Sequence, residues 1–368
     1  VTDMAKDNAS VIIGLIALAF ALPMFGLTMI GGAIADRFPR KRMLWIVQCC
    51  YLAFSTTLAI VTLLDLIQIW MLILYSFGNG LVLAFDSPAR NALLPDLVSK
   101  EDLAGAVSLN SAAYSGAALI GPAVAGALIP IIGVGGVYTF TAVSVVAVLI
   151  ALARMKDVPE YAIDKKSQGN VWKSIKRGVH FALESRVILG VLAVSVVSGI
   201  FARSYGPLLV IFARDEFHVG SFKFGLMVAA PGIGTLIAAF FLASRKDMGE
   251  RGKKLWIFVS ALSVVLMIFA AMPWYFGGLP MLVVTGFCAT LTAATMATII
   301  QLQTPQELRG RIMSIYMMTL IAVPSIGTLI IGSIADIIGV RVTVFTGAAI
   351  VLGIVALIFM RNQQLREV

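Results

Sequence analysis

The chain has 368 residues, of which 60% are hydrophobic and 13% charged, and its mean hydropathy is +0.96. These values exclude an ordinary soluble domain and indicate a protein with several membrane-spanning helices. The formal net charge of +9 would suit a nucleic-acid-binding protein, but the bases gather in alternate loops between apolar runs, so we exclude a nucleic-acid partner.

Apolar runs long enough to cross a bilayer recur along the chain. A hydrocarbon core about 30 Å thick needs about 20 apolar residues per helix. Nine runs meet this need, and prolines and glycines at 130–136 and 273–280 divide two of them, so we predict eleven spans in an all-helical membrane protein. The runs are 8–35, 43–64, 66–85, 103–153, 187–213, 224–244, 255–306, 312–335 and 342–360.

The distribution of lysine and arginine predicts the orientation. If the loop that contains Arg37 is cytoplasmic, 23 of the 28 bases fall in cytoplasmic segments. This is the positive-inside bias of membrane proteins. It predicts a multi-pass protein of the cell (inner) membrane with a cytoplasmic C-terminus.

The sequence shows no signal for catalysis, metal binding or cofactor binding. Cys49, Cys50 and Cys288 fall within spans and read as small apolar residues, not as disulfides or metal ligands. The sequence contains no phosphate-binding loop, metal-ligand cluster or nucleophile–base arrangement. We therefore expect no enzyme activity, no cofactor and no metal.

The two halves of the chain resemble each other at a nearly constant offset. Gly14-Leu15 matches Gly225-Leu226 and Trp45-Ile46 matches Trp256-Ile257, both at an offset of 211. The span 187–213 has no counterpart in the first half, so we expect a parent of six plus six spans whose first helix is absent from this chain. The predicted parts are an N-terminal bundle (1–154), a cytoplasmic linker (155–186) and a C-terminal bundle (187–368). The linker contains either an amphipathic helix on the membrane surface or a solvated helix.

Several motifs carry a family resemblance. The run from Gly32 through Asp36 to Arg42 resembles the loop signature of the major facilitator superfamily, with Pro39 where a glycine is usual. Segments 85–95, 101–103, 108–113 and 307–314 resemble the branch that contains enterobactin-type siderophore exporters and macrolide efflux proteins. The resemblance runs from the first residues to about Gly339 and implies a major-facilitator-type bundle.

The loop signature suggests a contact between two helix ends. Asp36 lies where a span meets the cytoplasm, and a carboxylate there can face the N-terminus of another helix. Thr304-Pro305-Gln306-Glu307 predicts such an N-terminus, with a capping box and proline at its first position. The resemblance implies that Asp36 docks there and that Arg40 pairs with Asp86, which would hold the outward-open state. We call the following set the cytoplasmic latch: Gly32, Asp36, Arg37, Arg40, Lys41, Arg42, Asp86, Arg90, Thr304, Glu307, Arg309 and Arg311.

The bases of the latch have a simpler interpretation, in which they only set the topology. Gly116, Gly121, Pro122 and Gly126 resemble the glycine–proline motif of drug:proton antiporters, although Ala125 stands where a glycine is usual. They could equally be small packing residues.

Arg203 is the clearest ion within a span, where a charge usually faces a cavity or a partner. It could bind an anionic or catecholate-like substrate, tune a nearby acid, or extend outward to the membrane surface. Asp86 and other acids lie at span ends, so a coupling proton would use the absent first helix or Asp86, unless coupling is absent. Further candidate cavity residues are Asn79, Asn110, Tyr114, Tyr205, Gln301 and Tyr316.

These observations favour a secondary active transporter that exports small amphiphilic molecules of the drug or siderophore type. The expected mechanism is alternating access about a midplane site, and the resemblance alone implies proton antiport. We expect a monomer whose partners are the bilayer, a small-molecule substrate and a proton. Alternatives are a lysophospholipid or other lipid translocator and a transport-inactive membrane fragment.

Overall fold

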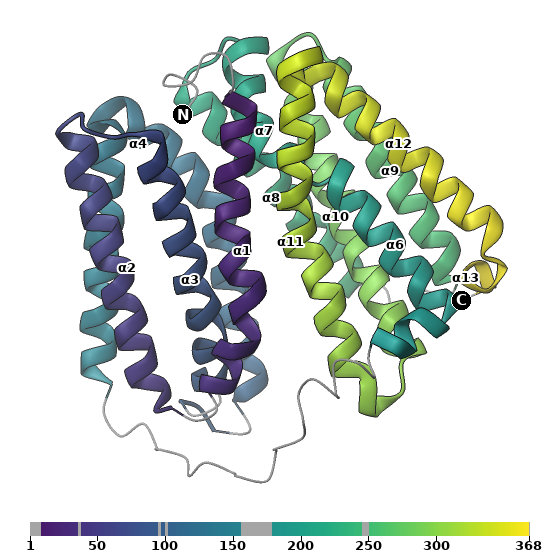
Figure 1. Cartoon of the computed structure of the whole chain (residues 1–368), viewed down its shortest axis with the longest axis horizontal. Helices are drawn as coiled ribbons and strands as arrows, with labels where there is room; N and C mark the ends of the chain where they lie inside the picture. The colour runs from purple at the N-terminus through teal and green to yellow at the C-terminus, as the bar shows by residue number, and fades with distance from the viewer. Residues whose placement is uncertain are drawn as a thin grey trace. The chain divides into compact units, whose positions relative to one another are not determined.

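The computed structural model describes residues 9–35, 38–94, 97–99, 102–155, 179–244 and 250–367. Each regular element in these ranges is a helix (Figure 1), which confirms the predicted all-helical class. Within the described ranges, nine helices are long and apolar enough to cross a membrane, and Ala9–Met24 forms a shorter apolar helix.

The difference between nine and eleven spans arises at α1 (Ala9–Ala35) and α4 (Leu103–Arg154). Helix α4 contains two of the predicted spans. Gly133 interrupts it with φ 70° and ψ 174°, a conformation that glycine adopts easily because it has no Cβ. The interruption lies inside the predicted break at 130–136.

The other predicted break, at 273–280, separates α9 (Arg251–Ala271) from α10 (Tyr275–Gln303). The chain turns at 272–274, and Pro280 lies within the first turns of α10.

The chain divides into two compact units, one of Val1–Lys6 and Leu15–Lys166, the other of Asp7–Gly14 and Ser167–Val368. Most of the predicted linker, 156–178, lies outside the described residues. Its amphipathic helix and the domain limits at 154 and 186 therefore stay predictions.

The first unit contains most of α1 together with α2 (Arg40–Leu63), α3 (Ile69–Leu93) and α4 (Figure 1). Helix α2 packs against both α3 and α4. One buried apolar cluster joins these three helices at the start of α2 and the ends of α3 and α4. It consists of Met43, Leu44, Val47, Ala89, Leu93 and Leu152.

The second unit has a larger core. Helix α10 packs on α8 (Ser221–Ala243) and α9, α12 (Val340–Arg361) packs on α9, and α11 (Gln306–Ile338) packs on α6 (Arg186–Phe201). The short helix α13 (Gln363–Glu367) follows α12. The core of the second unit includes the fully buried side chains of Phe212, Leu262 and Phe269.

The predicted span 187–213 is interrupted. Helix α6 ends at Phe201, α7 (Tyr205–Ile211) follows, and a short π-helix, η2 (Phe212–Glu216), continues it. Because lipid offers no hydrogen bonds, the interruption must be satisfied by protein groups. The Ser204 hydroxyl lies 2.9 Å from the carbonyl oxygen of Pro324 and 2.8 Å from that of Gly199, so α11 supports the interruption.

The first turns of α1 belong by contact to the second unit. The backbone N–H groups of Ser10 and Val11 donate to the Asp336 carboxylate at 3.2 and 3.1 Å. A Cβ added at Gly14 would lie 2.5 Å from the Cα of Leu329, so the approach is close. An acid at the end of α11 therefore satisfies donors that the first turn of a helix leaves without partners.

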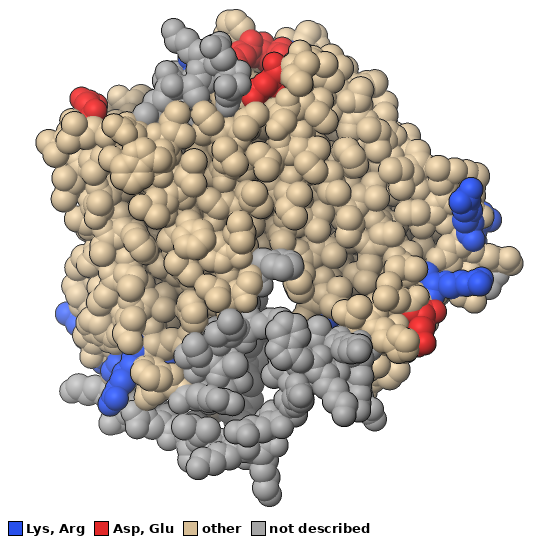
Figure 2. All heavy atoms as spheres, viewed as in Figure 1, with Lys and Arg blue, Asp and Glu red and all other residues tan. Residues whose placement is uncertain are grey.

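Most side chains on the face drawn in Figure 2 are uncharged, and the described acids and bases that it shows lie toward its margins. Large exposed side chains such as Ile131, Phe240 and Ile337 are apolar. This pattern is that of a multi-pass membrane protein.

The crossing of α8 and α10 yields the first prediction. A Cβ at Gly286 would lie 1.9 Å from the carbonyl oxygen of Pro231, and one at Gly234 would lie 1.8 Å from that of Val283. Gly286→Ala should therefore force the helices apart and lower the free energy of unfolding by about 1–3 kcal/mol. The measurement is the thermal midpoint of the purified protein in detergent.

Gly353→Ala is the matched control, since an added Cβ there meets no described atom within 4 Å. It should leave the midpoint unchanged or raise it slightly, because alanine favours a helix over glycine. Equal midpoints for the two variants would contradict the close crossing.

Candidate functional site

The described part of the latch centres on the Asp86 carboxylate. Gln48 Nε2 donates to Asp86 Oδ1 at 2.8 Å, and Arg90 donates to Oδ2 through Nη2 at 2.9 Å and Nε at 3.1 Å. Asp86 is 7% exposed, whereas the Arg90 side chain is 51% exposed. Neighbouring helices α2 and α3 thus hold a buried carboxylate whose counter-charge reaches the surface.

The bases at 40–42 open α2 directly after Pro39. Lys41 Nζ donates to the carbonyl oxygen of Met155, which follows α4, so this base ties two helix ends together within the first unit. The described partners of Asp86 are Gln48 and Arg90. The Arg40–Asp86 pair stays a prediction.

Other latch residues are only partly described. Asp36 and Arg37 lie outside the described residues, and for Gly32 and Glu307 only the helical backbone is described. Arg309 is exposed and Arg311 half-buried, both in the first turns of α11. The docking of Asp36 is therefore not visible.

The start of α11 differs from the predicted capping box. Pro305 has φ −53° and ψ 145°, so it is the N-cap residue and not the first helical residue. No side-chain cap bond is described at this end, and the Thr304 hydroxyl is buried without a described partner. The predicted cap is wrong by one position, because the extended proline moves Thr304 out of reach of the first turn.

The first unit contains a cavity of about 170 Å³ at the same end as Asp86. Gln48, Arg90 and the predicted cavity residue Asn110 line it, together with aliphatic side chains such as Leu44 and Leu152. This volume is below the 300–1,000 Å³ typical of sites for drug-sized molecules. The cavity can hold small polar species beside the Asp86 cluster.

The second unit places Arg203 at the interruption between α6 and α7, where it lines a small cavity. Two predicted cavity residues, Tyr205 and Tyr316, are buried close enough to act electrostatically on Arg203. The Tyr316 hydroxyl donates to the carbonyl oxygen of Ala293 at 2.8 Å. The sequence thus identified three residues that the fold brings together.

Of the remaining candidates, Asn79 and Gln301 are not among the described residues that line either cavity. Asn79 is half-buried, Gln301 is exposed, and the side chain of Tyr114 is not described. In the glycine–proline motif, Pro122 is half-buried and Gly126 buried. A Cβ added at Gly116 or Gly121 meets no described atom within 4 Å, so none of the described contacts requires glycine at these two positions. A role for the motif in transport stays a prediction.

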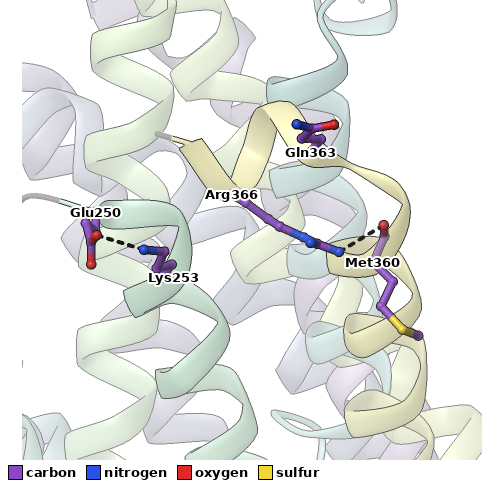
Figure 3. A pocket seen from close by; sticks show the side chains of 5 residues that line it. All are labelled: Glu250, Lys253, Met360, Gln363 and Arg366. Atoms are coloured by element: carbon purple, nitrogen blue, oxygen red, sulfur yellow. Dashed lines mark hydrogen bonds and ion pairs between the residues drawn. The ribbon is translucent and has the colours of Figure 1, made fainter.

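A pocket of about 400 Å³ lies where α9 begins and α12 ends (Figure 3). Lys253 Nζ pairs with Glu250 Oε1 at 2.7 Å, and Arg366 Nη2 donates to the carbonyl oxygen of Met360 at 3.0 Å. The hydrogen bond and charge of Lys253 lower the pKa of Glu250. The three charged side chains of this pocket thus bind one another or the backbone, as expected where helix ends pack together.

The sequence of the whole chain, residues 1–368, matches the profile of the transmembrane secretion effector family. Relatives include the enterobactin exporter EntS of Shigella boydii serotype 18, which is 25% identical over 315 residues, or 84% of this chain and 74% of that protein. EntS of Escherichia coli O1:K1 is 24% identical with the same coverage.

Solved structures of transporters share the fold. A bacterial homologue of the human lysosomal transporter Spinster, in an inward-facing and unoccupied conformation, superposes with a TM-score of 0.75 at 13% identity over 99% of this chain and 92% of that one. The nucleoside transporter NupG superposes with a TM-score of 0.75 at 14% identity, over 98% of this chain and 93% of that one. These likenesses support the fold alone.

The Asp86 cluster yields the second prediction. Asp86→Asn keeps the shape of the side chain but removes the charge that holds Arg90. Because Arg90 is half exposed, we expect a loss of only about 1 kcal/mol of unfolding free energy. Asp65→Asn, at an exposed turn with φ 55° that asparagine adopts easily, should change the thermal midpoint little. A midpoint for Asp86→Asn that equals that of the Asp65 control would contradict the cluster.

Proposed function

Because the chain belongs to the transmembrane secretion effector family of the major facilitator superfamily, we propose that it is a secondary active transporter that exports small amphiphilic molecules. The observation that carries the proposal is the family match over the whole chain, together with relatives named as enterobactin exporters. We place the protein in the cell (inner) membrane as a monomer with a cytoplasmic C-terminus.

The proposed mechanism is alternating access, in which the two helical units move about a central substrate site. Proton antiport drives it, and Asp86, the buried carboxylate of the first unit, is the proposed carrier of the proton. Protonation of Asp86 would remove the charge that binds Arg90 and change the acceptors offered to Gln48. Such a change in a buried polar cluster couples protonation to the position of α2 and α3.

The cytoplasmic latch controls the outward-open state in this proposal. Helix α11 begins without a described side-chain cap, so the N–H groups of its first turn are suited to an external carboxylate. Asp36 supplies that carboxylate. In this proposal Arg40, Lys41 and Arg42 at the start of α2 and Arg309 and Arg311 at the start of α11 belong to the same latch. The glycine–proline motif of α4 supports proton antiport, because it resembles the motif of drug:proton antiporters.

Efflux from cells tests the function. Cells that express the protein are loaded with a siderophore, a macrolide or a dye, and export is followed with and without a protonophore. We expect protonophore-sensitive export of at least one compound. Asp36→Asn should lower the export rate about tenfold, the value of one lost charge-assisted hydrogen bond, at equal membrane expression.

Asp65→Asn serves as the control because it removes an acid outside the latch. Equal rates for the two variants would remove the latch from the mechanism. If a well-expressed protein exports none of the compounds, the export proposal fails, and lipid translocation becomes the next activity to measure.

A further inference from the structure

Arg203 has no counter-charge among the described residues of the second unit. A charged group within a span is costly unless an opposite charge or polar groups surround it. Each described carboxylate of this unit lies against another partner. These acids are Glu184 with His180, Asp215 with Arg214, Glu216 with Arg341, Glu250 with Lys253, and Asp336 with the backbone of Ser10 and Val11.

Two hydroxyl groups on the same cavity also lack partners among the described atoms. The side-chain oxygens of Ser198 and Thr292 are buried, make no hydrogen bond, and line the cavity with Arg203. The residues are 3% and 5% exposed. A buried hydroxyl without a partner destabilises the folded protein, so this arrangement calls for an acceptor.

The behaviour of Thr292 is exceptional within its own helix. The other four threonines of α10 donate to the carbonyl oxygen four residues earlier, as hydroxyls in apolar helices usually do. They are Thr285, Thr290, Thr295 and Thr298, with donor–acceptor distances of 2.8, 2.9, 2.8 and 2.9 Å. Thr292, which faces the cavity, makes no such bond among the described contacts.

A third hydroxyl on the cavity, that of Ser195, already has a hydrogen-bond partner. Thr319 Oγ1 donates to the carbonyl oxygen of Tyr316 at 2.7 Å, so the Ser195 hydroxyl is the donor in its 2.7 Å bond to Thr319. The donors left for a ligand are therefore Arg203, Ser198 and Thr292. A cation and two hydroxyl donors together suit an anion.

We propose that this cavity binds the anionic head of an amphiphilic organic acid, such as a carboxylate or phenolate. The free space is about 10 Å³, enough for about one water-sized group, so it can take one oxygen atom of the acid group while the rest of the molecule stays outside the cavity. Leu262, Met296 and Leu320 line the cavity beside the donors, so an acceptor there would be held in largely apolar surroundings. The assignment rests on the proposed function, because it names the acid group of the exported compound.

Binding to the purified protein in detergent tests the site without transport. Benzoate is the probe, benzamide is its neutral isostere, and the buffer contains no chloride. We expect saturable binding of radiolabelled benzoate, with benzamide competing at least about tenfold more weakly because it lacks the charge that pairs with Arg203.

Variants then assign the binding to the three donors. Arg203→Gln, Ser198→Ala and Thr292→Val should each weaken benzoate binding about tenfold or more, the effect of losing a hydrogen bond to a charged group. The matched controls are Thr295→Val and Ser263→Ala, whose hydroxyls are buried but bond to Leu291 and Val259. These controls should bind benzoate like the unchanged protein.

A thermal melt of each variant shows whether it is folded. If Arg203→Gln does not fold, the two hydroxyl variants and their controls carry the test. Benzoate binding that is the same in all variants overturns the proposal.

Chloride separates an organic head group from an inorganic ion. Chloride that raises the thermal midpoint only when Arg203 is present, with no benzoate binding, would make this a halide site and overturn the proposal. Benzoate binding by a protein that exports nothing supports the site and refutes the export function. Export by a protein that does not bind benzoate supports the export function and overturns the proposed site.

Discussion

The absence of water in a bilayer core is the constraint on which the rest of this structure depends. A backbone carbonyl or a charged side chain there must find its partner within the protein. The interruption after α6 is held by Ser204 and Pro324, and the buried Asp86 is held by Gln48 and Arg90. In both places a side chain takes the role that water plays outside the membrane.

The two units meet this constraint in different ways for their charged side chains. The first unit surrounds Asp86 with donors from its own helices, and the counter-charge of Arg90 reaches the surface. The second unit holds Arg203 beside hydroxyls that have no described acceptor. The first unit thus compensates its buried charge with its own donors, whereas the second leaves donors directed at a cavity.

The sequence predicts the fold well because apolar runs, prolines and glycines act locally. The breaks at Gly133 and between α9 and α10 follow from such signals. The site is harder to predict. Arg203 was visible as an ion in a span, but Ser198 and Thr292 look like any helical hydroxyls, since only the packed structure shows that they lack partners. Close packing by Gly234 and Gly286 was missed for the same reason, because it depends on which helices cross.

The contact between Asp336 and the start of α1 has a consequence for how force would pass along that helix. An α-helix of 27 residues is about 40 Å long, and Pro23 inside α1 removes a backbone hydrogen bond at a point where the helix can bend. One end of α1 is fastened by the acid that ends α11. The chain just beyond the other end carries the acid proposed to fasten the beginning of α11. A force on the first turn of α1 would therefore be absorbed in part by bending at Pro23 before it reaches the other end of the helix.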